Sequence, residues 1–222
     1  MILINCFIIY CFHSNAVESG LDDVLVHSLR ASIENNLGND TLSKIEQRLM
    51  ERHGMSLVQS ITNFHKLDSV LREFFGAGAD GLEKQFLQSI INIEKSKQSH
   101  SSWIQIKDSE LSKVFLESFA DQDKNSIIGS VMDEPLIISD IIEKSKVSQT
   151  SGYRKINFLI NHGLLVSNGF ELVNDRKRVK KYETIFNDVK MDIVKNLVIV
   201  KIQLKKNFLN ESSIFQTVQI HS

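Results

Sequence analysis

The chain has 222 residues, which is enough for two modest domains and too few for three average ones. Its apolar share of 42% and charged share of 24% are ordinary for a globular protein, and its single proline argues against a long disordered or loop-rich all-β architecture. We therefore expect a mainly α fold with some β structure, of the α+β class. The net charge of −1 gives no overall attraction to nucleic acid, so the distribution of charge along the chain matters more.

Positive charge is concentrated in one segment. Residues 18–95 contain twelve acidic and eight basic side chains, whereas residues 148–181 contain seven basic side chains and only two acidic ones, Glu171 and Asp175. An anionic partner is therefore expected at the second segment.

The chain begins with an apolar stretch, MILINCFIIYCF. It is shorter than the roughly 20 residues of a membrane-spanning helix, and it lacks the basic region and clear cleavage site of a secretory signal. We expect residues 1–16 to be a loosely attached or non-native extension, with an added core helix or strand and weak membrane contact as alternatives. The two cysteines, Cys6 and Cys11, both lie here, so we expect no disulfide across the fold and a cytoplasmic location, with no membrane partner.

Residues 17–95 have a helical pattern throughout. Apolar side chains recur at three- and four-residue steps, as between Leu21 and Leu29. Helices can begin at Thr41, Ser56 and Asp68, and they should end near the glycines at positions 38, 54, 76 and 78. The pattern predicts four or five short helices in one bundle, which would receive a signal or a protein partner.

A linker is expected at residues 96–107. Residues 96–102, SKQSHSS, are polar without periodicity, and the two halves of the chain should be separable there. The last part, Trp103 to Ile106, alternates enough to form a short strand.

Three helices are expected between residues 108 and 161. Asp108 can cap a helix that runs to Ala120, and a second helix covers residues 121–132 and is ended by Pro135. Ser139 can cap a short helix that leads into a turn. Ser148 is then a good cap for a last helix that ends at Asn161, with Gly163 as its left-handed stop.

The helix at residues 148–161 presents two different faces. Its core side would be Ile156, Leu159 and Ile160, which leaves polar and basic residues exposed. Gln149 and Asn157 can pair with an adenine edge, and arginine binds guanine or phosphate. Small hydroxyl residues near the helix start can bind phosphate with help from the helix dipole. The DNA-contacting residues expected from this helix are Ser148, Gln149, Thr150, Ser151, Tyr153, Arg154, Lys155 and Asn157.

A basic hairpin should follow. Residues 164–173 and 179–185 have the composition of two strands, and the turn at residues 174–177 contains Asn and Asp. Lysine and arginine at this hairpin would neutralise phosphates, which makes binding depend on salt. The hairpin residues expected to contact DNA are Arg176, Lys177, Arg178, Lys180 and Lys181.

Residues 186–222 are expected to form a second hairpin and a tail. Apolar residues alternate from Val189 to Ile193 and again from Val198 to Leu204, with a break between them, which favours strands over a helix. From Phe208 onward we expect a helical turn followed by a frayed end.

The segment SQTSGYRKINFLINHGLLV, residues 148–166, is similar to the recognition-helix motif of winged helix-turn-helix regulators of the ArsR type and of related archaeal regulators. The resemblance covers residues 108–185, and EPLIISDI at 134–141 matches the second helix of that family. It implies a recognition helix in the DNA major groove and a hairpin wing on the phosphates. Gly152 replaces the apolar residue usual in the family, which weakens the helix by about 1 kcal/mol relative to alanine unless close approach to DNA or to another helix requires a glycine. Metal-sensing members carry paired cysteines in the second helix, and residues 136–142 have none, so no metal is expected.

The segment LREFFGAGADGLEKQFLQSI, residues 71–90, resembles the small helical Nitrosopumilus output domain of ammonia-oxidising archaea, over residues 21–93. That resemblance implies a regulatory or interaction module with no chemistry of its own.

Catalytic motifs are missing from the sequence. It contains no P-loop, no dinucleotide-binding glycine pattern and no HExxH, and GAGAD at 76–80 follows a helix instead of a strand. His27, His53 and His65 are scattered over predicted helices, where histidines are usually surface or core groups. We expect no enzyme and no cofactor.

Together these patterns predict a sequence-specific transcriptional regulator that binds double-stranded DNA as a homodimer. Two copies are expected because one recognition helix covers few base pairs. The dimer interface would involve the strands after Val189 or the helix at residues 108–120. The alternative is a protein-interaction or signalling adaptor whose winged helix serves as a docking surface without binding DNA.

Overall fold

A computed structural model describes residues 20–94, 103–173, 177–195 and 197–220. These residues form helices and antiparallel sheets, in agreement with the expected α+β class. The predicted N-terminal extension, most of the predicted linker and Arg176 lie outside the described residues. No helix in the described ranges is long and apolar enough to cross a membrane.

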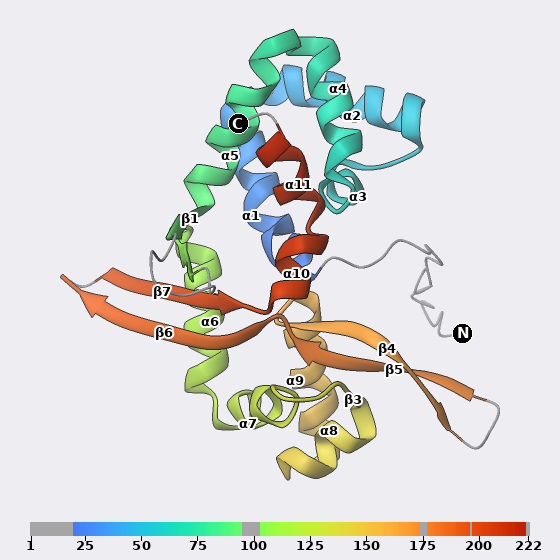
Figure 1. Ribbon diagram of the computed structural model, residues 1–222, viewed down its shortest axis with the longest axis vertical. Helices are drawn as coiled ribbons and strands as arrows, with labels where there is room; N and C mark the ends of the chain where they lie inside the picture. Colours follow the sequence, from blue (N-terminus) through green and yellow to red (C-terminus); the bar gives the residue numbers. More distant parts are fainter. Residues whose placement is uncertain (1–19, 95–102, 174–176, 196, 221–222) are drawn as a thin grey trace, which may run out of the picture.

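The first part of the described chain is a helical bundle, as predicted (Figure 1). Ser56 caps a helix as expected, in a reciprocal capping box with Gln59, and Gly54 ends the preceding helix in the left-handed conformation. The predicted start at Asp68 is wrong, because this residue lies mid-helix and binds Arg72 one turn later. The start near Thr41 is two residues late. The elements are α1 (Gly20–Leu37), α2 (Asn39–His53), α3 (Leu57–Ile61), α4 (Phe64–Phe75), the 3-10 turn η1 (Gly76–Gly78) and α5 (Ala79–Ile90).

A four-stranded antiparallel sheet follows the bundle. Its strands are β1 (Ile91–Glu94), β2 (Trp103–Ile106), β6 (Phe186–Val194) and β7 (Leu197–Leu204), in the order β1-β2-β7-β6. The predicted strand β2 and the predicted hairpin of β6 and β7 are confirmed. The residues of β1 were expected to continue a helix, but they pair with β2 across the segment of residues 95–102.

The second group of elements runs from α6 to β5. Helices α6 (Ser109–Ala120) and α7 (Gln122–Ser130) lead to strand β3 (Leu136–Ile137) and then to helices α8 (Ile138–Ser145) and α9 (Gln149–Asn161). Strands β4 (Leu165–Val173) and β5 (Lys177–Thr184) form a hairpin, and β3 pairs with β5 to give the sheet order β3-β5-β4. Ser139 is not the cap that was predicted, because Ile137 at the end of β3 already supplies the extended residue before α8.

The chain ends in two helices, α10 (Lys206–Glu211) and α11 (Ser213–Ile220), where a single helical turn and a frayed tail were predicted. They return from the sheets to the helical bundle, where α10 packs on α1 and α11 packs on α4 and α5 (Figure 1). Ile214 and Phe215 are buried in this contact. Burial of two large apolar side chains stabilises this helix, which the local pattern alone did not predict.

One buried carboxylate connects the first and last helices of the described chain. Asp22 on α1 accepts hydrogen bonds from the Ser212 hydroxyl at 2.5 Å and from the Ser213 amide and hydroxyl at 2.8 and 2.7 Å. The Ser213 hydroxyl also accepts a bond from the backbone amide of Phe64. Together with the pairing of β2 and β7, these contacts join the halves of the chain into one packing unit, contrary to the expectation that they separate at residues 96–102.

Candidate nucleic-acid interface

Helix α9 is held by its apolar side. Ile156 and Leu159 are fully buried against α7, α8 and β4, while Ile160, predicted to be in the core, is only half-buried. Gly152 is explained by the approach of α8, since a Cβ at this position would lie 3.0 Å from Cγ1 of Ile142. Gly163 has a φ of 70° and sits against the backbone of α1, where a Cβ would lie 2.6 Å from the Val24 nitrogen. Both glycines therefore fix the position of α9.

The opposite side of α9 is open to solvent. Ser148 is the N-cap residue, as predicted, but its side chain makes no capping hydrogen bond. The first amide groups of the helix therefore lack a side-chain partner there and can bind an anion. The residues exposed on this helix and its cap are Ser148, Gln149, Thr150, Tyr153, Arg154, Asn157 and Asn161.

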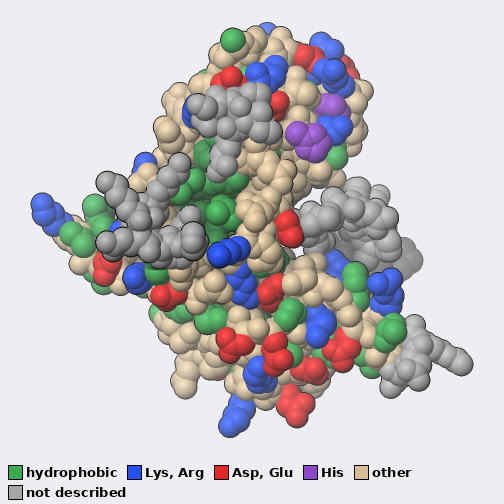
Figure 2. Space-filling view, viewed as in Figure 1, with side chains coloured by type: hydrophobic (Ala, Val, Ile, Leu, Met, Phe, Trp, Pro, Cys, Tyr) green, Lys and Arg blue, Asp and Glu red, His purple; other side chains and the backbone are tan. Residues whose placement is uncertain are grey.

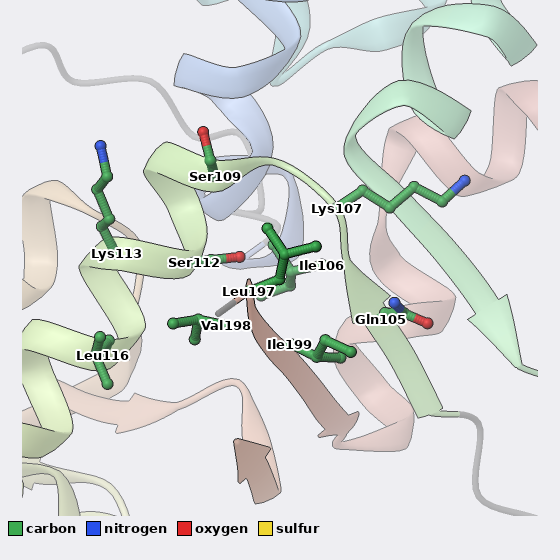
Figure 3. Close-up of a pocket in the computed structure, with 10 residues that line it drawn as sticks. All are labelled: Gln105, Ile106, Lys107, Ser109, Ser112, Lys113, Leu116, Leu197, Val198 and Ile199. Carbon is green, nitrogen blue, oxygen red and sulfur yellow. The ribbon is translucent and has the colours of Figure 1, made fainter. Parts of the chain in front are cut away.

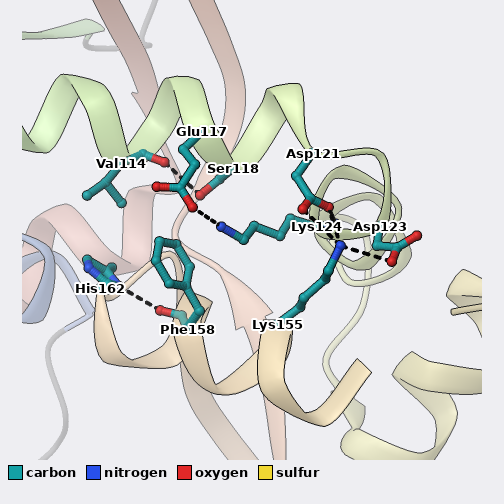
Figure 4. A network of polar contacts seen from close by, with 9 residues as sticks. All are labelled: Val114, Glu117, Ser118, Asp121, Asp123, Lys124, Lys155, Phe158 and His162. Carbon is teal, nitrogen blue, oxygen red and sulfur yellow. Dashed lines mark hydrogen bonds and ion pairs between the residues drawn. The ribbon is translucent and has the colours of Figure 1, made fainter. Parts of the chain in front are cut away.

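Two predicted DNA contacts bind acidic side chains of the protein instead: Lys155, shown in Figure 4, and Ser151. Lys155 Nζ lies 2.7 and 2.8 Å from the two Asp121 carboxylate oxygens and 2.9 Å from Asp123, and its side chain is only 13% exposed. The hydrogen bond to Asp121 raises the pKa of Lys155 and lowers the pKa of Asp121. The Ser151 hydroxyl bonds the Asp123 carboxylate at 3.4 Å. The prediction for Lys155 is wrong because it anchors α9 to the start of α7.

A second lysine, Lys124, strengthens the contact between α7 and α9. Lys124 Nζ lies 2.5 Å from Glu117 and 3.5 Å from the centre of the Phe158 ring, so an ion pair and a cation–π contact link α6, α7 and α9 (Figure 4). The His162 ring stacks on Phe158 at 4.2 Å. No local sequence pattern predicts this cluster, because its members come from three helices.

The hairpin of β4 and β5, which we call the basic hairpin, carries most of the exposed positive charge predicted for this region. Lys177, Arg178 and Lys180 are exposed, whereas Lys181 is half-buried with its Nζ 3.8 Å from Glu171. Arg178 stacks over the Phe170 ring at 4.7 Å. The strand register places exposed Phe170 and Leu172 opposite Lys180 and Arg178, on one face of the hairpin.

The base of this hairpin is shaped by a bulge at Asn168 and Gly169. The register shifts between Ser167 and Phe170, and Gly169 has a φ of 79°, which a residue with a side chain rarely adopts. Glu183 anchors the bulge by accepting hydrogen bonds from Asn168 and from Lys205, the latter at 2.6 Å. The bulge therefore sets the position at which β4 bends toward the exposed end of the hairpin.

Charge is mixed on the surface around α7 and α8. Acidic and basic side chains are intermixed over the lower part of the molecule in Figure 2, and the described residues form no continuous positive area on that face. Arg154 is the one exposed cation that α9 contributes in the described chain. Of α9 and the basic hairpin, the hairpin therefore carries most of the exposed positive charge.

A separate surface combines the other hairpin with α6. A groove of about 450 Å³ lies between α6, β2 and β7, and its apolar lining is Ile106, Leu116, Leu197, Val198 and Ile199 (Figure 3). Beside it, Ile193 and Leu197 are 75% and 69% exposed at the tip of the hairpin of β6 and β7, which we call the apolar-tipped hairpin. Such an exposed apolar group marks a surface suited to a protein partner.

Comparison of the chain with known protein families, with curated proteins and with solved structures finds no match.

Proposed function

We propose that the chain is a DNA-binding transcriptional regulator in which α7 to β5 act as a winged helix-turn-helix. The observation that carries the proposal is the element order α7, β3, α8, α9, β4, β5 with the sheet order β3-β5-β4. In a winged helix, the helix before the hairpin enters the major groove and the hairpin grips the flanking backbone. The proposal assigns these two roles to the exposed polar side of α9 and to the cations of the basic hairpin.

The proposed division of roles follows from side-chain chemistry. Gln149 and Asn157 can each bond an adenine edge in two places, and Arg154 can do the same with guanine. Tyr153 adds an exposed aromatic ring to the same face. The hairpin cations recognise only charge, so they supply affinity while α9 supplies sequence preference.

A homodimer is part of the proposal, with the apolar-tipped hairpin as the contact. Strand β6 is at the edge of its sheet and carries the sequence Val189-Lys190-Met191-Asp192-Ile193. If two copies of β6 paired in antiparallel fashion about Met191, Lys190 of each copy would lie opposite Asp192 of the other. Val189 of each copy would lie opposite Ile193 of the other. This self-complementary register favours a second copy of the chain over an unrelated partner.

The alternative function is a protein-interaction adaptor without DNA binding. The apolar groove and the hairpin tip favour this function if the protein that they bind is not a second copy of the chain. The intermixed acidic side chains around α7 and α8 also favour it, since they weaken attraction to phosphates (Figure 2).

A salt titration separates the two functions. Binding of a fluorescent 30-base-pair duplex of random sequence would be followed by anisotropy at several salt concentrations. We expect micromolar or tighter binding at low salt, with log K falling against log salt at a slope of about −3 if three hairpin cations each meet one phosphate. Failure to bind at tens of micromolar, or binding that ignores salt, would contradict the proposal and support the adaptor.

A further inference from the structure

A compact group of acidic side chains lies in the helical bundle, away from α9 and both hairpins. Asp68 lies on α4, and Asp80 and Glu83 lie one turn apart on α5. One carboxylate oxygen from each lies within 4.8 Å of the others. The short turn η1 folds α5 back against α4, so residues distant in the sequence meet here.

Glu83 is the unusual member of the group. It is 1% exposed, and neither of its carboxylate oxygens has a hydrogen-bond partner. An ionised carboxylate in such a place is costly unless a proton or a cation balances it. Burial, followed by repulsion from Asp68, raises the pKa of Glu83 to about 8.

Arg72 accounts for only part of the negative charge. Its Nε lies 2.7 Å from Oδ1 of Asp68, and its Nη2 bonds Oδ1 of Asp80. These contacts hold both aspartates in place and use one oxygen of each. When all three carboxylates are ionised, Arg72 offsets one of three negative charges, and a divalent cation would offset the other two.

We propose that Asp68, Asp80 and Glu83 bind one hard divalent cation, of the class of Mg²⁺, Mn²⁺ or Ca²⁺. The site offers only oxygen ligands, which this class of ion prefers over nitrogen and sulfur. The Asp68 and Asp80 side chains are 16% and 32% exposed, so an ion has a route from solvent and water can complete its coordination. A bound ion would join α4 to α5 and stabilise the bundle.

Mn²⁺ binding to the full chain tests the proposal without reference to DNA. After treatment with EDTA and buffer exchange, the loss of the free Mn²⁺ signal in electron paramagnetic resonance gives the number of bound ions. We expect about one ion per wild-type chain, displaced by excess Mg²⁺ or Ca²⁺, and a higher melting temperature with the ion than without it.

Matched variants locate the site. Glu83→Gln and Asp80→Asn each keep the side-chain size, and we expect each to weaken Mn²⁺ binding by at least 10- to 100-fold and to remove the ion-dependent rise in melting temperature. Glu46→Gln, an exposed position on α2, should bind as the wild type does. Circular dichroism checks that each variant is folded.

Two results would overturn the proposal. One is a wild-type chain that binds no Mn²⁺ and gains no stability from any of the three ions, which would mean that a proton alone balances Glu83. The other is an ion that binds Glu83→Gln and Asp80→Asn as tightly as the wild type, because the ion would then occupy another place.

Discussion

The two long hairpins share one buried base and differ in the side chains that they expose at their ends. Ile185 and Phe186, where β5 passes into β6, are fully buried, and the hairpins extend from there in opposite directions (Figure 1). The basic hairpin exposes Lys177, Arg178 and Lys180 toward its end. The apolar-tipped hairpin exposes Ile193, Val194 and Leu197 at its end, with one described cation, Lys195, among them.

This difference indicates two kinds of partner. Exposed cations on a projecting hairpin attract a polyanion at long range and need no exact fit. Exposed apolar side chains gain free energy only when a complementary surface removes them from water. The proposed regulator uses one hairpin for the DNA backbone and the other for its second copy, so changes in one hairpin should leave the function of the other intact.

The largest expected effect is the reversal of charge on the basic hairpin. Changing Lys177, Arg178 and Lys180 together to glutamate should lower DNA affinity on the order of 1000-fold at low salt, because three phosphate contacts become repulsive. The control reverses the charge of three exposed cations outside both hairpins, Lys44, Arg48 and Lys206, and so changes the net charge by the same amount. Anisotropy titrations of both variants compare them directly. Equal losses would mean that net charge, and not the hairpin, governs binding.

The second prediction concerns the apolar-tipped hairpin. Ile193→Asp together with Leu197→Asp should raise the dimer dissociation constant about 100-fold or more, since unpaired charges would be buried at the contact. Light scattering during size-exclusion chromatography measures the mass. Leu172→Asp, at a similarly exposed position on the basic hairpin, should leave the mass unchanged. A double variant that remains as dimeric as the wild type would move the interface elsewhere.

The third prediction separates two neighbouring cations on α9. Arg154 is exposed, whereas Lys155 is held by Asp121 and Asp123. Arg154→Met should weaken DNA binding about 10-fold and leave the melting temperature unchanged. Lys155→Met should lower the free energy of unfolding by about 1 to 2 kcal/mol, a modest value because Asp121 and Asp123 are partly exposed. A Lys155 variant of full stability would contradict the anchoring role.

The same ion pair predicts a dependence of stability on pH. Lys155 lowers the pKa of Asp121, so between the folded pKa and the ordinary value near 3.8 the unfolded chain binds more protons than the folded one. The contribution of the pair to stability is therefore complete above that range and is lost as pH falls through it. The free energy of unfolding, measured with urea, should fall more steeply from pH 6 to pH 2 for the wild type than for Lys155→Met. Parallel curves would show that the pair does not stabilise the fold.

Much of this arrangement could be predicted from the sequence, because local patterns determine it. Helical spacing and caps predicted α9, and alternation predicted both hairpins. Lys155 was assigned to DNA because its partner Asp121 is 34 residues away and nothing in the local sequence marks the pair. Helix α11 and strand β1 were missed for the same reason, since each is stabilised by contacts with distant parts of the chain. The burial of Glu83 likewise depends on the packing of α4 against α5.

The smallest expected effect tests whether the two hairpins divide their roles completely. The basic hairpin also has an apolar component, because Phe170 lies beneath Arg178 with the guanidinium 4.7 Å from the ring. A cation–π contact at an exposed site is worth about 0.5 to 1 kcal/mol, so Phe170→Ala should free Arg178 and weaken DNA binding only about two- to fivefold. Phe170→Tyr keeps an aromatic ring and should bind as the wild type does. If Phe170→Ala instead changes the oligomeric mass and leaves DNA binding alone, the basic hairpin also contributes to the dimer and the two hairpins do not have separate partners.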